Sequence, residues 1–320
     1  MPKAPNLTSY TELSTLANCE MKWWLRYKEH IKGEQSEAMF LGSLMGKLCD
    51  AFTRGDPWRS VAQALWSEYA EAHDLNVDVD VEKLDIAPWP KALWLMARYE
   101  RHYASDLGSF RVVAQEQHYK ARIPSTKQTH EAYIDEVWED HLGRLWVVER
   151  KTYGRNTKSE NVWVDPQLTL NLWVAKAATG IEFAGIVWDG IYTYQWKPDK
   201  PTQGALIAER IEDGIGAVDD DFAGWTKKAQ QEWARGAVER HPGVDRADSE
   251  SFERLWMDRT PEHIDAALKE VRGAVRRREA LRRGATPLRN IGPLCGFCDG
   301  KSTCFSRLAF PQDDIVIVED

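Results

Sequence analysis

The spacing of hydrophobic positions changes twice along the chain, from helical spacing to strand spacing and back. Over the first hundred residues apolar side chains recur every three or four positions, which is the period of an amphipathic helix. Ser9 or Thr11 can cap the first helix, and Glu12 follows Ser9 at the spacing of a capping box. The predicted helices of this part are an opening helix that reaches about Tyr27, then 39–55, 58–73 and 89–105.

The middle of the chain carries strand signals instead. Runs of β-branched and aromatic residues bounded by turn residues are typical of strands. Asp165 followed by Pro166 suits the N-cap and the first position of a helix. The predicted order is strand 111–123, strand 131–139, a turn at 141–144, the strand LWVVERKTY, a helix from Pro166 to Gly180 and strand 183–194. This succession predicts an α/β core.

Helical spacing returns in the last third of the chain, at about 204–237 and 261–283, before a cysteine-rich end. Residues 197–203 and 241–249 are the expected flexible connections. We therefore divide the chain into a helical part (1–105), an α/β core (106–200) and a second helical part with the cysteines (201–320), expected to form one integrated globular unit.

Composition narrows the class of protein. With 43% hydrophobic and 29% charged residues, the chain has an ordinary globular composition. No apolar run is long enough to span a membrane, and the first residues lack the apolar core of a signal peptide, so a cytoplasmic location is expected. The net charge of −8 argues against a passive nucleic-acid binder, but it is compatible with an enzyme that gathers carboxylates at a metal site.

Three of the five cysteines lie close together near the end of the chain, as Cys295, Cys298 and Cys304 in the spacing C-x2-C-x5-C. A complete tetrahedral zinc site or a cubane cluster needs a fourth thiolate. Cys19 and Cys49 are the candidates, and Cys49 lies in an apolar helical run that indicates a buried thiol. We therefore expect Cys19 to join the group and to tie the two ends of the chain together. Zinc, an iron–sulfur cluster and free cysteines all remain open on spacing alone.

A second group of candidate residues lies on the predicted hairpin. Because strand side chains alternate, Glu149 and Lys151 share a face, and Asp135 can approach them from the neighbouring strand. They follow an apolar run, where an isolated charge is costly. Two carboxylates can hold Mg²⁺ or Mn²⁺, with the main-chain carbonyl of Arg150 as a further ligand. The metal would activate water for phosphodiester hydrolysis, and Lys151 would orient the water or stabilise the transition state. The alternative is a cross-strand ion pair on a solvated surface.

Taken together, these segments resemble the PD-(D/E)-x-K nuclease superfamily, in its RecB-like branch of iron–sulfur exonucleases. The similarity extends from SYTELSTLANC to CGFCDGKSTC, and YIDEV, VVERKT and PQLTLN match the family's metal-binding and catalytic segments. It implies a restriction-endonuclease-like α/β fold, with a central mixed sheet flanked by helices and with helical terminal parts joined by a metal cluster. The implied cofactors are a 4Fe-4S cluster on Cys19, Cys295, Cys298 and Cys304, and Mg²⁺ or Mn²⁺ on Asp135 and Glu149. The implied activity is DNA exonuclease action on single-stranded ends, with Gln167 beside the scissile phosphate.

Two positions depart from the family pattern. Gly46 occupies the place where a metal-binding His is expected in a G-x3-H motif, and Asn171 occupies the place of a Tyr. Glu116 or Asp50 is a candidate to replace the missing His as a ligand. The main alternatives are therefore a non-catalytic DNA-binding or adaptor protein on a decayed nuclease fold, and a zinc-stapled structural protein.

Other polar features have two interpretations each. The arginine-rich stretch 272–283 is either a DNA-tracking surface or a solvated helix. His118 and His130 are expected to be structural, and Lys197 and Lys200 to lie in a solvated loop. No Gly-rich phosphate loop is present in the sequence, so any unwinding would need a helicase or recombination partner. A bacterial protein or a phage protein in the host cytoplasm fits these features, and the sequence leaves the oligomeric state and cleavage polarity open.

Overall fold

The computed structural model describes residues 6–31, 36–154, 159–193, 251–292, 295, 298 and 300–306. The predicted helix 204–237 and the predicted connections 197–203 and 241–249 lie outside the described residues. No helix among the described residues is long and apolar enough to cross a membrane.

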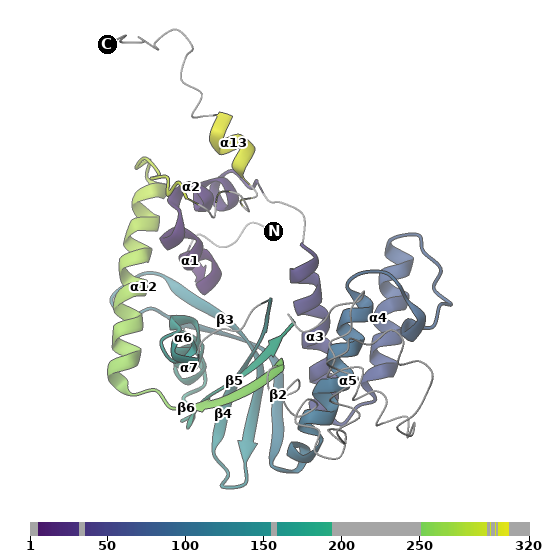
Figure 1. Cartoon of the computed structure of the whole chain (residues 1–320). Coiled ribbons are helices and arrows are strands. Elements are labelled where there is room, and N and C mark those ends of the chain that lie inside the picture. Colours follow the sequence, from purple (N-terminus) through teal and green to yellow (C-terminus); the bar gives the residue numbers. More distant parts are fainter. Residues whose placement is uncertain are drawn as a thin grey trace, which may run out of the picture.

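A six-stranded mixed sheet forms the centre of the molecule (Figure 1). The strands run in the order β1-β3-β4-β5-β6, and β2 pairs with the other edge of β3. Pairing is parallel for β1–β3 and β4–β5 and antiparallel for the rest. The strands are β1 Leu7–Ser9, β2 Phe110–Arg122, β3 Thr129–Asp140, β4 Leu145–Tyr153, β5 Gly185–Tyr192 and β6 Phe252–Met257.

Helices cover both faces of this sheet (Figure 1). On one face, α7 packs on β2 to β5, and α12 lies along α1 and α7. On the other face, α3, α4 and α5 form an apolar cluster that includes Ile191 of β5 and Phe252 of β6. The helices are α1 Tyr10–Asn18, α2 Glu20–Trp23, a π-helical turn Trp24–Lys28, α3 Glu37–Arg54, α4 Trp58–Ala72, α5 Trp89–Tyr103, α6 Ser159–Trp163, α7 Pro166–Thr179, α12 Pro261–Arg282 and α13 Lys301–Ser306, with short 3₁₀ turns at Val81–Lys83 and Ala104–Gly108.

The ends of the helices follow from their local sequence. The Ser9 hydroxyl accepts a hydrogen bond from the backbone N–H of Glu12 (3.4 Å), which confirms the predicted cap of α1. Asp165 caps α7 by accepting from the N–H of Gln167 at 2.8 Å. Gly55 and Gly180 end α3 and α7 in the left-handed conformation that glycine adopts without strain.

Three features differ from the sequence prediction. The opening helix breaks at Cys19, whose extended backbone separates α1 from α2. The strands β1 and β6 were not expected, because β1 has only three residues and β6 follows a segment predicted as a connection. Both strands join the central sheet from outside residues 106–200, so the sheet draws on all three predicted parts of the chain.

Arginines of α12 hold the two ends of the chain together. The Arg278 side chain is fully buried, and its guanidinium donates to the Glu12 carboxylate at 3.3 Å and to the Leu7 carbonyl at 3.1 Å. It also bonds to Gln128, beside β3. Arg277 binds the Glu20 carboxylate through two nitrogens at 2.5 and 2.6 Å. These two arginines are thus structural, which neither interpretation of the arginine-rich stretch anticipated.

We predict that Arg278→Met lowers the free energy of unfolding by about 3 kcal/mol, because the buried Glu12 carboxylate loses the guanidinium that contacts both of its oxygens. Arg276→Met is the matched control, since that neighbouring side chain is exposed and should change stability by less than about 0.5 kcal/mol. Urea unfolding of both variants measures the difference. Equal stability of the two variants would contradict the structural role of Arg278.

Candidate active site

The candidate site lies where β3 and β4 separate. Their last paired residues on this side are Glu136 and Val148, while the start of β3 pairs with β1 instead. Asp135 lies just beyond this pairing, and its Oδ2 accepts a hydrogen bond from the backbone N–H of Arg150 at 2.6 Å. The Asp135 carboxylate thus accepts the Arg150 N–H where the backbone of β3 no longer does. This hydrogen bond holds Asp135 beside Glu149 and Lys151.

Glu149 is the centre of the group, and its side chain is almost fully buried. Its Oε1 contacts the Lys151 Nζ at 2.5 Å and accepts from the Gln167 Nε2 at 2.9 Å. Its Oε2 accepts from the Asn171 Nδ2 at 2.7 Å. Gln167 and Asn171 are one turn apart on α7, so this helix presents both amides to the same carboxylate.

Asn171 is the residue whose role the sequence did not predict. In sequence Asn171 only departs from the Tyr of the family pattern, but in the structure its amide donates to one oxygen of Glu149. The sequence did carry a signal for this role. Asn171 lies four residues after Gln167 on one helix, so it shares the face that brings Gln167 to the site. Asp135, Glu149, Lys151 and Gln167, which the sequence did single out, lie together.

Burial dominates the electrostatics of the site. It raises the pKa of the Glu149 carboxyl to about 7, with a further rise from the Asp135 charge, while Lys151 opposes it. Burial also raises the pKa of Asp135, against the opposing effects of the Arg150 N–H and of nearby cations. Burial lowers the pKa of Lys151, but the neighbouring Glu149 carboxylate outweighs this and leaves the pKa raised.

These charges make the site suitable for a divalent cation. The buried Glu149 and the half-buried Asp135 are two carboxylates beside one ammonium group, that of Lys151, so the ionised trio carries a net negative charge. Hard carboxylate oxygens are the ligands that Mg²⁺ and Mn²⁺ prefer. Among the residues that the structure describes, no group of three or more His, Cys, Asp or Glu side chains is arranged to hold a metal ion. Beyond these two carboxylates, the candidate ligands are the main-chain carbonyl of Arg150 and the side chain of Glu116.

The two candidate replacements for the missing His lie in different places. Asp50, on α3, binds the Arg150 guanidinium at 2.7 Å and is therefore engaged on the opposite side of β4. Glu116 is exposed on β2 at a left-handed φ of 48°. Its neighbours Gln115 and Gln117 pair with Glu136 and Ile134, so Glu116 lies opposite Asp135 in register.

Gly46, at the expected His position, leaves free space. A Cβ atom built on Gly46 would meet no other atom within 4 Å. One turn earlier, a Cβ on Gly42 would lie 4.0 Å from the Thr152 hydroxyl, and one turn later Asp50 contacts Arg150. The face of α3 that carries Gly46 therefore packs toward the end of β4, and a side chain larger than glycine would fit at position 46.

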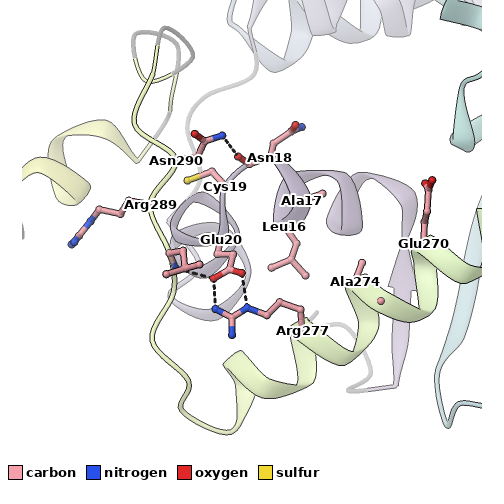
Figure 2. A pocket seen from close by; sticks show the side chains of 12 residues that line it. Leu16, Ala17, Asn18, Cys19, Glu20, Glu270, Ala274, Arg277, Arg289 and Asn290 are labelled. Carbon is pink, nitrogen blue, oxygen red and sulfur yellow. Dashed lines mark hydrogen bonds and ion pairs between the residues drawn. The ribbon is translucent and has the colours of Figure 1, made fainter.

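Residues around Cys19 bring the cysteine-rich end of the chain to α1 and α2. The Met21 N–H donates to the Leu288 carbonyl (3.0 Å), and the Asn290 side chain donates to the Asn18 carbonyl (2.9 Å). Figure 2 shows Cys19 between these contacts and the Glu20–Arg277 pair, at the wall of a pocket of about 710 Å³. Two segments that lie some 270 residues apart in sequence are therefore adjacent here.

The other three cysteines of the group follow this contact in the sequence, and among the described residues they are not gathered with Cys19 into a metal-binding group. Cys295, Cys298 and Cys304 are free and half-buried, and the Gly292 N–H donates to the Cys295 sulfur at 3.5 Å. A Cβ atom on Gly300 would clash with the Leu25 side chain at 2.6 Å, so Gly300 packs closely against the π-helical turn Trp24–Lys28. Cys49, by contrast, is fully buried and lies 3.8 Å from the Met96 sulfur, as expected for a core thiol.

The two histidines near the core strands have partners that fit a structural role. His118 Nε2 lies 3.1 Å from the Glu131 carboxylate, and its ring stacks on Tyr133 with centroids 4.1 Å apart. His130 is fully buried at the start of β3. Lys197 and Lys200 lie outside the described residues.

Comparison with known proteins gives a family match and two similar solved structures. A family model described as the PD-(D/E)XK nuclease superfamily matches residues 8–305. A solved structure from Eubacterium rectale, of a protein described as a "putative exonuclease", is 12% identical with a TM-score of 0.50, and the match covers 93% of this chain and 88% of that one. A second structure, of SSO0001, is 9% identical with a TM-score of 0.37 and covers 95% and 88% of the two chains. No curated protein matches the sequence.

We predict that Mn²⁺ affinity depends on the ionisation of Glu149. Burial raises the pKa of this carboxyl to about 7, and only the ionised form binds a cation. The apparent affinity should therefore rise about tenfold per pH unit below about pH 7 and become constant above it. Calorimetric titrations across this range measure the effect, with Glu149→Gln as a control that should bind weakly at every pH. A flat profile in the wild type would refute the assignment of Glu149.

Proposed function

The chain belongs to the PD-(D/E)XK nuclease superfamily, and on that premise we propose that it is a metal-dependent DNA exonuclease that acts on single-stranded ends. The observation that carries the proposal is the meeting of Asp135, Glu149 and Lys151 where β3 and β4 diverge. Gln167, which the family resemblance puts beside the scissile phosphate, bonds to the same Glu149. These contacts support the proposal that the four residues form one active site.

Asp135, Glu149 and the main-chain carbonyl of Arg150 would hold Mg²⁺ or Mn²⁺, with Glu116 as a further candidate. When bound, such a cation activates water and neutralises charge on the phosphate. Lys151 supplies a fixed ammonium beside the carboxylates, where it can orient the attacking water and stabilise negative charge on the phosphate. Gln167 and Asn171 hold the Glu149 carboxylate in one orientation through its two oxygens.

We assign the four cysteines Cys19, Cys295, Cys298 and Cys304 to a structural 4Fe-4S cluster. They are half-buried free thiols on segments that pack together, and the Gly292 N–H already donates to one sulfur, as amides do to clustered thiolates. The RecB-like resemblance favours iron–sulfur over zinc. A cluster at this place would reinforce the contacts between α2 and the end of the chain.

One observation supports a second candidate function. The free space at Gly46 is consistent with a DNA-binding or adaptor protein that has lost a metal ligand and catalysis. The intact contacts among Asp135, Glu149, Lys151 and Gln167 favour the catalytic alternative, because a buried carboxylate is costly and a decayed site has no need to retain one. A bacterial or phage origin, in recombination or repair with a separate helicase, fits the proposed activity.

We predict that Lys151→Ala lowers kcat on the order of 10²- to 10³-fold, because the charge that stabilises the transition state is lost. Lys176→Ala is the matched control, since that lysine lies on α7 and pairs with the exposed Glu182. The assay uses Mn²⁺ and single- and double-stranded DNA labelled at either end. Metal-dependent release from the wild type and the control, but not from Lys151→Ala, supports the nuclease. DNA binding without cleavage by the wild type would favour the adaptor function.

We predict that anaerobically purified protein is brown and holds about four iron and four sulfide per chain. Cys19→Ser should lose most of this iron, because it removes one of the four ligands. Cys49→Ser should keep the iron, since Cys49 lies in the core between α3 and α5. Iron and zinc analysis with visible spectra distinguishes the outcomes. A colourless wild type that contains zinc would refute the iron–sulfur assignment.

A further inference from the structure

Arg150 lies between Glu149 and Lys151 in sequence, but its side chain leaves β4 on the opposite face of the sheet. The Arg150 side chain is only 3% exposed. Its nitrogens contact three carboxylates: Asp50 at 2.7 Å, Asp189 at 3.2 Å and Glu136 at 3.4 Å. These three come from α3, β5 and β3, so a single side chain is fixed from three elements of the fold.

Two of the three carboxylates, Glu136 and Asp189, have further partners that hold them in place. Thr53 and Gln115 donate to Glu136 at 2.5 and 2.7 Å. The Tyr99 hydroxyl donates to Asp189, which also faces Arg254 at 3.5 Å. Because these partners are buried and bonded, the Arg150 side chain has little freedom to move.

The backbone of the same residue reaches the candidate active site. The Arg150 N–H donates to Asp135 Oδ2 at 2.6 Å, beyond the last backbone pair of β3 and β4. At this point β3 and β4 no longer form a regular ladder of backbone hydrogen bonds. On its other edge β4 still pairs with β5, with Arg150 opposite Asp189. The position of the N–H, and with it the orientation of Asp135, is therefore set by this pairing together with the buried anchor of the Arg150 side chain.

The geometry points to Arg150 as a positioning residue: the buried ion pairs of its side chain fix its backbone N–H, which in turn holds Asp135 toward Glu149 and Lys151. This inference rests on the proposed function in taking Asp135 and Glu149 as the metal ligands. It gives Arg150 a role through its side chain and N–H, separate from its main-chain carbonyl.

Packing alone does not explain an arginine at this position. Val148, two residues earlier on the same face of β4, fills an apolar cluster with Trp138 and Val187. An apolar side chain at position 150 would avoid the cost of removing a guanidinium and several carboxylates from water. What the charged network adds over such a side chain is a directional anchor, because each ion pair fixes both distance and orientation.

The test compares Arg150→Lys with Arg254→Lys. Both wild-type arginines are buried and contact Asp189, but Arg254 lies on β6 and has no bond to Asp135. We expect Arg150→Lys to weaken Mn²⁺ binding about 10- to 100-fold and to lower kcat more than it raises KM, as for residues that orient metal ligands. Arg254→Lys should change Mn²⁺ affinity less than about threefold, even where thermal unfolding shows equal loss of stability.

Two further measurements keep the inference testable. Asp50→Asn leaves Arg150 in place and weakens one anchor, so it should reduce Mn²⁺ affinity in the same direction but less. Hydrogen exchange of peptides covering β4 needs no metal. Arg150→Lys should speed exchange at the end of β4 that follows Glu149, whereas Arg254→Lys should not.

Unchanged exchange and unchanged metal affinity in Arg150→Lys, or equal losses in both lysine variants, would overturn the positioning role. A wild type that neither binds Mn²⁺ nor cleaves DNA would instead refute the proposed function, while the exchange result would still decide the role of Arg150.

Discussion

The ion network around Arg150 is the constraint on which the arrangement of the sheet and its helices depends. A buried charge is tolerated only when its partners are within reach. Arg150 pairs with Asp50, Glu136 and Asp189, so α3, β3 and β5 must all be correctly placed against β4 at the same time. The opposite face of β4 then presents Glu149 and Lys151 at a defined position against α7. One strand thus carries a structural network on one face and the candidate chemistry on the other.

Much of this could be predicted from local sequence. The predicted hairpin strands lie within one or two residues of β3 and β4, and the caps at Ser9 and Asp165 are as expected, because short-range rules set them. Side-chain alternation was enough to put Glu149 and Lys151 on one face. The mixed sheet flanked by helices agrees with the predicted fold class.

Long-range partners could not be predicted. Alternation shows that Arg150 faces away from Glu149, but not that Asp50, a hundred residues earlier, would meet it. The same holds for Arg277 and Arg278, whose sequence suggested a solvated or DNA-facing helix and whose partners are Glu20 and Glu12. The short strands β1 and β6 also depend on partners elsewhere, since three residues such as Leu7–Ser9 carry no strand signal of their own.

The contact between β1 and α12 has a consequence for synthesis of the chain. Arg278, which bonds to the Leu7 carbonyl, is added 271 residues after it. At ordinary translation speeds of about 5 to 20 residues per second, roughly 15 to 50 s pass between the two. During that time the nascent chain lacks the helix that secures β1 and Glu12. The packing around β1 is therefore completed only after Arg278 has left the ribosome, so this strand waits for most of the described residues to be synthesised.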